Sequence, residues 1–166
     1  IMGCVGQAGE QAFHVGRNAV LASSLPQSVP AVTIDRQCGS SQQSIHFAAQ
    51  GVMAGAYDVV VAAGVEVMTT TPMGASITPG SVPFGPSVLA RYAPQGGLVP
   101  QGISAELIAD KWGLSRTDLD TFGAQSQQRA AAATAEGRFD NEIIPVAEKR
   151  LDRETGNVVE TGEMVT

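Results

Sequence analysis

Residues 29–68, VPAVTIDRQCGSSQQSIHFAAQGVMAGAYDVVVAAGVEVM, decide the fold class of this chain. Residues 29–35 are apolar and rich in β-branched side chains, and polar Arg36 and Gln37 follow them, which indicates a short buried strand. Residues 57–66 form a near-continuous apolar run of strand length, which is typical of a strand covered on both faces by helices. The stretch therefore begins and ends in strands of an α/β structure.

Between these two strands, apolar residues recur at helical spacing from Gly39 up to Gly55, which punctuates the end of the pattern. The pattern predicts a helix that is apolar on most sides and therefore buried. Strand, helix and strand together predict a βαβ unit, in which Cys38 lies where the first strand turns into the helix. The apolar positions with the helical period are Ile45, Ala48, Ala49, Val52, Met53 and Ala56.

The character of the sequence changes in residues 68–102, where prolines and glycines alternate with short apolar runs. We predict no regular element there. A plain linker is one interpretation, but structureless stretches longer than about 12 to 15 residues are usually functional or disordered. Phe84, Leu89 and Tyr92 favour an ordered insertion.

Helical patterning resumes in residues 104–113, where Gly113 closes the first segment. A second helix is predicted from Ser115 to Gly137, because Ser115 and Asp118 resemble a capping box with Asp in place of Glu. Short strands are predicted at residues 142–146 and 158–160, around a charged turn at residues 152–156.

Length and composition favour a soluble globular chain of one domain, or parts of two, because 43% of its 166 residues are hydrophobic and 16% are charged. A net charge of -6 argues against nucleic-acid binding, which needs clustered Lys and Arg. No apolar run reaches the roughly 18 residues that a membrane span requires, and no signal-peptide pattern occurs. We expect a cytoplasmic protein without membrane association, truncated at both ends, since it starts at Ile1 within a predicted strand and stops at Thr166.

The chain has two cysteines, Cys4 and Cys38, which are too few for a disulfide framework and are expected to be reduced thiols. His14 and His46 do not lie at zinc-like spacings from either cysteine, so we predict no metal site.

Cys38 is the candidate nucleophile. It precedes Gly39, Ser40 and Ser41, small residues that let substrate approach the backbone at a helix start, where free N–H groups favour negative charge. A helix terminus stabilises a charge by about 0.3 to 1 kcal/mol, and by up to ~2 kcal/mol when buried, which leaves a thiol only partly ionised. A buried, inert cysteine is the alternative interpretation, and position and flanking residues alone leave both open.

A base is therefore expected near Cys38, and the chain offers two histidines. His46 lies eight residues along the same predicted helix, about 12 Å away along its axis, whereas proton transfer needs a separation of about 3 Å. His14 could reach Cys38 only through a fold that the sequence does not reveal. We interpret both as structural histidines on helix faces.

Residues 29–68 resemble the nucleophile region of the thiolase family, whose members include acetyl-CoA acetyltransferases and 3-ketoacyl-CoA thiolases. The shared pattern is VPA, a short strand, a polar triplet, Cys-Gly-Ser, a helix, and a strand ending in Gly-x-Glu-x-Met. A second block from Gln101, QGISAELIADKWGLSRTDLDTFGAQSQQRAAAA, and GRFDNEIIPV from Gly137 resemble the helical loop domain of the same family.

The resemblance implies part of a layered αβαβα thiolase fold, with residues 1–67 in the N-terminal domain and residues 68–166 in the loop domain. It implies that Cys38 takes an acyl group from 3-ketoacyl-CoA and passes it to coenzyme A, or runs the reverse condensation, with the Cys38 N–H as an oxyanion donor. Coenzyme A would be substrate and product, and no tightly bound cofactor is implied. A homodimer paired near residues 29–35, or a homotetramer joined through residues 68–102, is also implied.

The chain also departs from the thiolase pattern at several positions. The histidine base and second cysteine of thiolases belong to Gly-His-Pro and Cys-x-Gly-x-Gly segments of a C-terminal half, and neither segment occurs here. The family's water-positioning asparagine is absent, and Pro100-Gln101 stands where many members have His-Met. No residue that contacts coenzyme A can be assigned, and we predict negligible turnover for the 166 residues alone.

Two other interpretations stay open. Ketoacyl synthases share the architecture and a cysteine at the same turn, so condensation on a carrier protein is the nearest enzymatic alternative. A catalytically incomplete structural fragment of the thiolase fold, in which Cys38 merely packs, is the other.

Overall fold

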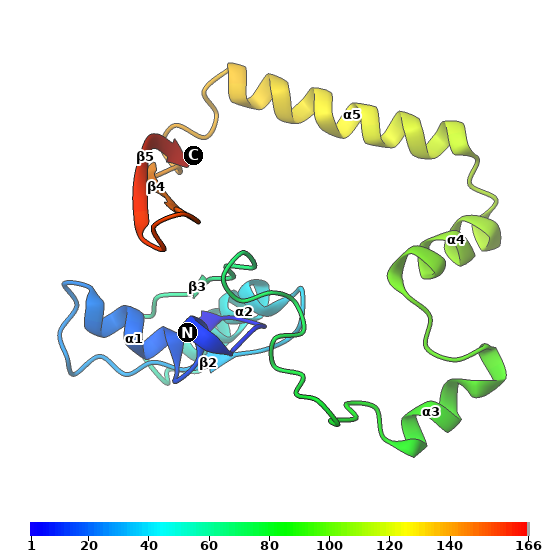
Figure 1. Cartoon of the computed structure of the whole chain (residues 1–166), viewed down its shortest axis with the longest axis horizontal. Coiled ribbons are helices and arrows are strands. Elements are labelled where there is room, and N and C mark those ends of the chain that lie inside the picture. Colours follow the sequence, from blue (N-terminus) through cyan, green and yellow to red (C-terminus); the bar gives the residue numbers. More distant parts are fainter. Residues whose placement is uncertain (166) are drawn as a thin grey trace. The chain divides into compact units, whose positions relative to one another are not determined.

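The computed structural model describes residues 1–165, which form two compact units, Ile1–Arg91 and Tyr92–Thr166 (Figure 1). Thr166, the last residue of the expected loop domain, lies outside the described residues. The helix α3 (Pro86–Tyr92) spans the boundary between the units.

The first unit contains a parallel sheet with the strand order β2-β1-β3. Its strands are β1 (Met2–Gly3), β2 (Thr33–Ile34) and β3 (Ala63–Gly64), and Met2 is in register with both Thr33 and Ala63. The predicted succession of strand, helix and strand is confirmed, because α2 (Ser40–Met53) connects β2 to β3. The two strands of the predicted unit pair with β1 and not with each other, and β1 separates them.

The predicted strands at 29–35 and 57–66 are wrong in length. Strand pairing extends only as far as the neighbouring strand, and β1 contributes two residues to it. The amides of Met2, within β1, and of Cys4, directly after it, donate to the carbonyls of Val32 (2.9 Å) and Ile34 (3.0 Å). The rest of each predicted strand belongs to no strand of the sheet in residues 1–165, and Asp58 lies in a bend.

The helix α2 confirms the predicted helix after Gly39, and Gly55 follows its C-cap with a φ of 69°, the left-handed conformation that ends helices. The prediction that it is buried on most sides is wrong for this chain. Its buried residues are Ser40, Ser44 and Ala48, spaced four apart, whereas Met53 is 87% exposed. The helix thus packs on the sheet with its small residues, and much of its apolar surface is left exposed.

Residues 68–102 were predicted to lack regular structure, which is wrong for residues 86–95 and for residues 101–102, where α4 (Gln101–Trp112) begins. The helix α3 begins at Pro86, a residue that suits a first helical position because its missing N–H needs no partner there. The 3-10 helix η2 (Ala93–Gln95) follows it directly. An ordered element therefore lies within the predicted insertion.

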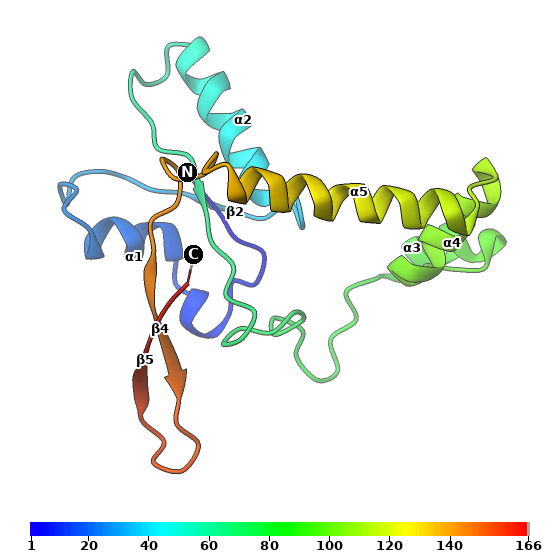
Figure 2. The same ribbon diagram turned by 90° about the horizontal axis from the view of Figure 1, so that it is seen from above.

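The predicted helix pair is confirmed in the second unit by α4 (Gln101–Trp112) and α5 (Arg116–Ala135), which Figure 2 shows as an uninterrupted helix. Gly113 ends α4 with a φ of 63°. The capping box is also confirmed, since the Ser115 side chain accepts from the Asp118 amide and the Asp118 carboxylate accepts from the Ser115 amide.

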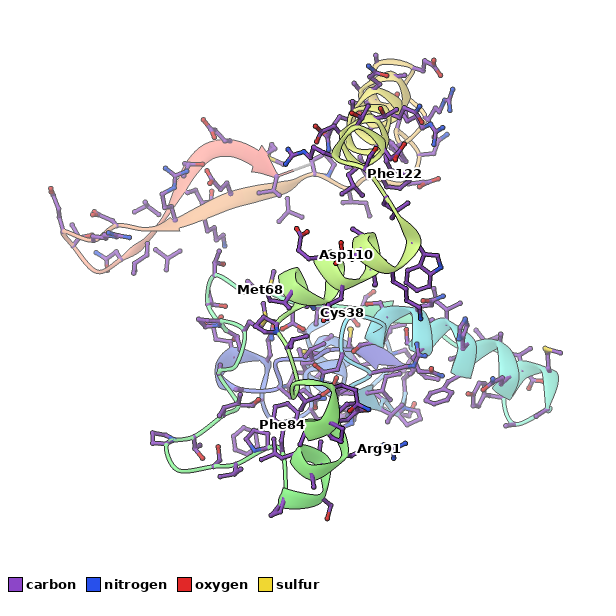
Figure 3. The ribbon with its side chains drawn as sticks, turned by 90° about the vertical axis from the view of Figure 1, so that its right-hand side faces the viewer. Cys38, Met68, Phe84, Arg91, Asp110 and Phe122 are labelled. Carbon is purple, nitrogen blue, oxygen red and sulfur yellow. The ribbon has the colours of Figure 1, made fainter. Side chains whose placement is uncertain are left out.

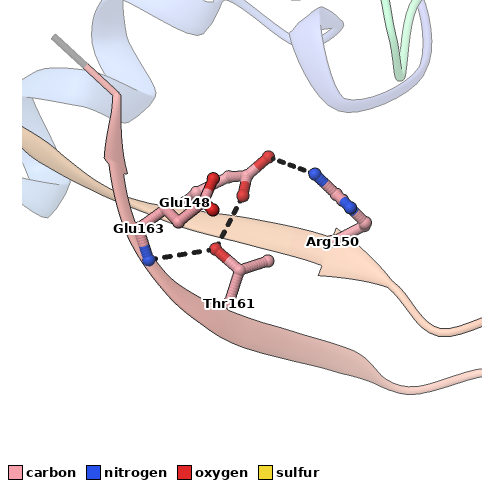
Figure 4. Close-up of polar contacts among 4 residues, drawn as sticks. All are labelled: Glu148, Arg150, Thr161 and Glu163. Carbon is pink, nitrogen blue, oxygen red and sulfur yellow. Dashed lines mark hydrogen bonds and ion pairs between the residues drawn. The ribbon is translucent and has the colours of Figure 1, made fainter.

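A hairpin follows, in which β4 (Val146–Leu151) and β5 (Val158–Val165) pair antiparallel. The strand predicted at 142–146 is wrong except at Val146, where β4 begins, because the amides of Glu142 and Ile143 are bonded to the Phe139 carbonyl in a turn. The strand predicted at 158–160 is confirmed and runs further. Figure 4 shows the Glu148 carboxylate of β4, which accepts from Thr161 of β5 (2.6 Å) and so joins the two strands of the hairpin, and which also accepts from Arg150 of β4 itself (2.9 Å).

Candidate active site

Cys38 lies in the turn between β2 and α2, directly after Gln37, and its side chain is exposed. Gln37 has a φ of 48°, a left-handed conformation that costs a residue with a side chain about 1 to 2 kcal/mol. The chain thus reverses sharply from strand into helix, which is the turn that the sequence predicted around Cys38.

Two side chains hold this turn. The Gln37 amide donates to Asp35 Oδ1 at 2.7 Å. Ser40, only 4% exposed, accepts from the Arg36 amide (2.9 Å) and donates to the Gln37 carbonyl (2.6 Å) through the same hydroxyl. These bonds offset the strain at Gln37, so the position of Cys38 is set by its neighbours on both sides.

Glycines let β1 and β3 approach the start of α2. A Cβ at Gly3 of β1 would overlap the Ser40 backbone, and a Cβ at Gly64 of β3 would overlap the Ser41 side chain. The buried Ser44 hydroxyl lies 2.7 Å from the Ser41 carbonyl and 2.9 Å from the Ala63 carbonyl, which ties α2 to β3. The first turn of α2 is therefore fixed against two strands.

A cavity of about 400 Å³ opens beside Cys38. The carboxyl ends of parallel strands meet at one edge of a sheet, which is where ligands bind in open α/β folds. Figure 3 labels Cys38 and Met68, which both line the cavity. Its walls are the residues after β1, the turn at Cys38, the residues after β3 and part of the following loop, namely Gly3, Cys4, Val5, Gly6, Gln37, Ser40, Ser41, Gly64, Val65, Glu66, Met73, Gly74 and Ser76.

Cys4 lines the same cavity but differs from Cys38 in chemistry. Both thiols are free, and Cys4 is 1% exposed. Burial raises the pKa of the Cys4 thiol, and the carboxylates of Glu66 and Asp35 raise it further. Cys4 is thereby held as a neutral thiol, which is a poor nucleophile.

Glu66 and Gln11 form a polar cluster at the cavity wall that sequence reasoning missed. The Gln11 side-chain amide and the backbone amides of Val5 and Gly6 donate to the Glu66 carboxylate and hold its pKa below the ordinary value. Glu66 was noted only as part of a family pattern. Gln11 carried no signal, because its partner is 55 residues away along the chain.

The two histidines lie elsewhere, and the lining residues of the cavity include neither of them. His14 caps α1 (Val15–Ala22): its Nδ1 accepts from the Arg17 amide at 3.1 Å, and its Nε2 lies 2.9 Å from the Ala31 carbonyl. His14 therefore has a structural role, at a helix start and not on a helix face as expected. His46 is an exposed residue of α2.

Residues 1–165 contain no group of three or more His, Cys, Asp or Glu side chains placed to hold a metal ion. None of the helices in that part of the chain is long and apolar enough to cross a membrane.

Fold and site define an α/β protein with a cysteine at a strand-to-helix turn, and comparison with known sequences assigns the family. The family described as thiolase, N-terminal domain, matches residues 1–166. The chain is 44% identical over 153 residues to the steroid 3-ketoacyl-CoA thiolase FadA6 of Mycobacterium tuberculosis, covering 88% of this chain and 37% of that protein. It is 42% identical over 146 residues to a 3-ketoacyl-CoA thiolase of Bacillus subtilis, covering 88% and 36%.

Solved structures agree with this assignment. The dimeric peroxisomal thiolase of Saccharomyces cerevisiae superposes with a TM-score of 0.71 at 32% identity, over 96% of this chain and 38% of that one. Human mitochondrial 3-ketoacyl-CoA thiolase in complex with CoA gives a TM-score of 0.69 at 30% identity, over 98% and 41%.

The chain belongs to the thiolase family. It has the α/β thiolase-like fold, as the resemblance implied, and spans 37% and 36% of the length of the two curated relatives above.

Proposed function

We propose that this chain carries the nucleophile of a thiolase-type acyl-CoA C-acyltransferase, with Cys38 as the residue that becomes acylated. In this reaction the Cys38 sulfur attacks the 3-keto carbon of a 3-ketoacyl-CoA. The bond between C2 and C3 breaks, and C2 gains a proton as acetyl-CoA leaves. The thiol of a second coenzyme A then takes the acyl group, and Cys38 recovers its proton.

The observation that carries the proposal is the placement of Cys38 at a strained, doubly held turn beside a cavity of about 400 Å³. The contrast between the two cysteines adds support, because the Cys38 thiol is exposed, whereas the Cys4 thiol is buried and held neutral. The backbone N–H of Cys38, in the turn directly before α2, is the proposed oxyanion donor.

The proposed active site is one half of the complete site. Neither a Gly-His-Pro nor a Cys-x-Gly-x-Gly segment occurs in residues 1–166, so the base and acid would come from sequence beyond them. We therefore expect the 166 residues alone to turn over negligibly, although Cys38 keeps its position.

We also propose domain bounds, an oligomeric state and a cellular location for the protein. Residues 1–67 would be part of the N-terminal domain and residues 68–166 part of the loop domain. A homodimer or homotetramer is proposed, supported by the dimeric yeast thiolase among similar structures. A cytoplasmic location is proposed because free thiols such as Cys4 and Cys38 fit a reducing compartment.

Alkylation of the full-length protein that carries this sequence tests the nucleophile. Iodoacetamide at neutral pH, with and without acetoacetyl-CoA, is followed at each cysteine peptide by mass spectrometry. We expect fast labelling of Cys38 that acetoacetyl-CoA prevents, and slow labelling of Cys4, which serves as the internal control. Equal, slow labelling of both cysteines would contradict the proposal.

The acyl acceptor is tested next with the acylated protein. Discharge of the Cys38 thioester by free coenzyme A supports a thiolase. Discharge only by the thiol of a carrier protein would support a ketoacyl synthase in its place.

A further inference from the structure

Gln11 is a buried polar residue whose side-chain amide is fully engaged in hydrogen bonds. It is 3% exposed and belongs to the 3-10 helix η1 (Gly9–Gln11). Its Nε2 donates to the Gly6 carbonyl (2.7 Å) and to Glu66 Oε1 (3.0 Å), and its Oε1 accepts from the Val67 amide (2.6 Å). One side chain thus contacts the residues after β1 and the residues after β3.

Glu66 makes the reciprocal connection. Although it belongs to the segment after β3, its carboxylate accepts from the amides of Val5 (2.8 Å) and Gly6 (3.1 Å), which follow β1. Hydrogen bonds to a charged acceptor are stronger than those between neutral groups. Gln11 and Glu66 together therefore form a strut, defined here as these two side chains and their bonds to Val5, Gly6 and Val67.

The strut holds part of the cavity beside Cys38. Val5, Gly6 and Glu66 all line that cavity, on the loops that the strut ties together. We propose that Gln11 and Glu66 are positioning residues, which fix this wall so that a substrate acyl group is held against Cys38. The inference rests on the proposed function, because Cys38 is taken as the reacting group.

The packing around Gly6 shows how closely the strut approaches the backbone. A Cβ at Gly6 would lie 2.7 Å from Glu66 Oε1, 3.3 Å from Gln11 Nε2 and 3.4 Å from Thr71 Cγ2. The first of these distances is too short for any carbon contact. The strut leaves no room for movement toward Gly6, and Gly6→Ala would displace Glu66 without removing its charge.

The test compares Glu66→Gln with Glu10→Gln in the full-length protein. Glu10 is an exposed residue of the same 3-10 helix as Gln11, so its variant controls for the change in charge. In Glu66→Gln an N–H group replaces one of the oxygens that accept from Val5, Gly6 and Gln11, and the strut loses a bond. The readouts are the rate of Cys38 acylation by acetoacetyl-CoA and the rate of Cys38 alkylation by iodoacetamide.

We expect acylation of Glu66→Gln to slow by ~10- to 100-fold, because small displacements of a positioned substrate carry such costs. Alkylation by the small reagent should stay within about twofold, since the turn at Cys38 is held by other residues. Glu10→Gln should match the wild type in both rates. Unchanged acylation in Glu66→Gln, or an equal loss of acylation and alkylation, overturns the proposal.

Amide hydrogen exchange separates failure of the strut from failure of the proposed function. The Val67 amide is bonded to Gln11 and not to Glu66, so its exchange should rise by about fivefold in Glu66→Gln if the two side chains act together. Unchanged exchange at Val67 overturns the strut even if the wild-type protein is not acylated at all. Should Glu66→Gln fail to fold, Gly6→Ala is tested by the same three readouts with the same expected result.

Discussion

At the scale of single residues, the turn that presents Cys38 depends on a few polar side chains. Ser40 was expected only as a small residue that lets substrate approach. Its hydroxyl instead joins the Arg36 amide to the Gln37 carbonyl across the strained residue Gln37. The sequence predicted where Cys38 lies, because Cys-Gly-Ser follows a strand pattern. It did not predict the left-handed Gln37, since Gln is an unusual residue in that conformation.

Ser40→Ala tests the importance of this hydroxyl. The variant leaves the Arg36 amide without its acceptor, so we expect the free energy of unfolding to fall by about 1 to 3 kcal/mol. Urea denaturation measures the change. Ser28→Ala, at an exposed position, is the control and should stay within about 0.5 kcal/mol of the wild type. Equal stability of the two variants would show that the turn does not need Ser40.

At the scale of elements, local and long-range patterns were predicted with different success. The helices α2, α4 and α5 were predicted well, because helical spacing, the capping box at Ser115 and the stop at Gly113 are all signals within a few residues. Strand lengths were wrong, because a strand ends where its neighbour ends, and β1 is far from both partners along the chain. The need for glycine at Gly3 and Gly64, where β1 and β3 meet α2, could also not be predicted, because it follows from packing between distant segments.

Gly3→Ala tests the packing of β1 on α2, and Gly123→Ala in α5, with the opposite expected sign, is its control. Gly3→Ala places a Cβ against the Ser40 backbone, which cannot move as a flexible side chain would, so we expect a loss of about 1 to 3 kcal/mol or more. Gly123→Ala, within α5, meets nothing within 4 Å and should gain about 0.8 to 1 kcal/mol through helix propensity. Thermal or urea unfolding checks both. A tolerated Gly3→Ala would mean that β1 does not pack closely on α2.

At the scale of the whole molecule, the described chain leaves much apolar surface in contact with solvent. The residues that gave α2 its apolar pattern include Ile45 and Val52, which are exposed, and the run that predicted β3 includes Val59, which is 88% exposed. Exposed apolar side chains that gather on a surface often mark interaction sites. The chain also spans 37% of the length of its relative FadA6. We predict that these side chains are less exposed in a protein of that length.

Binding of an apolar fluorescent dye such as anilinonaphthalene sulfonate tests this. The 166-residue chain should bind the dye and enhance its fluorescence by several-fold more per mole than the full-length protein does. Circular dichroism of both samples controls for unfolding. Equal dye binding by two folded samples would show that the apolar surfaces are not covered in the longer protein.

The sequence by itself determined the family, the α/β class, the main helices and the position of Cys38 between strand and helix. These follow from short-range periodicity and from residue order, which need no knowledge of distant contacts. Only the tertiary structure placed β1 between β2 and β3, bound Gln11 to Glu66 and separated the buried Cys4 from the exposed Cys38. The physical reason is that pairing and burial depend on which distant residues meet, and the sequence pattern around each residue does not name its partner.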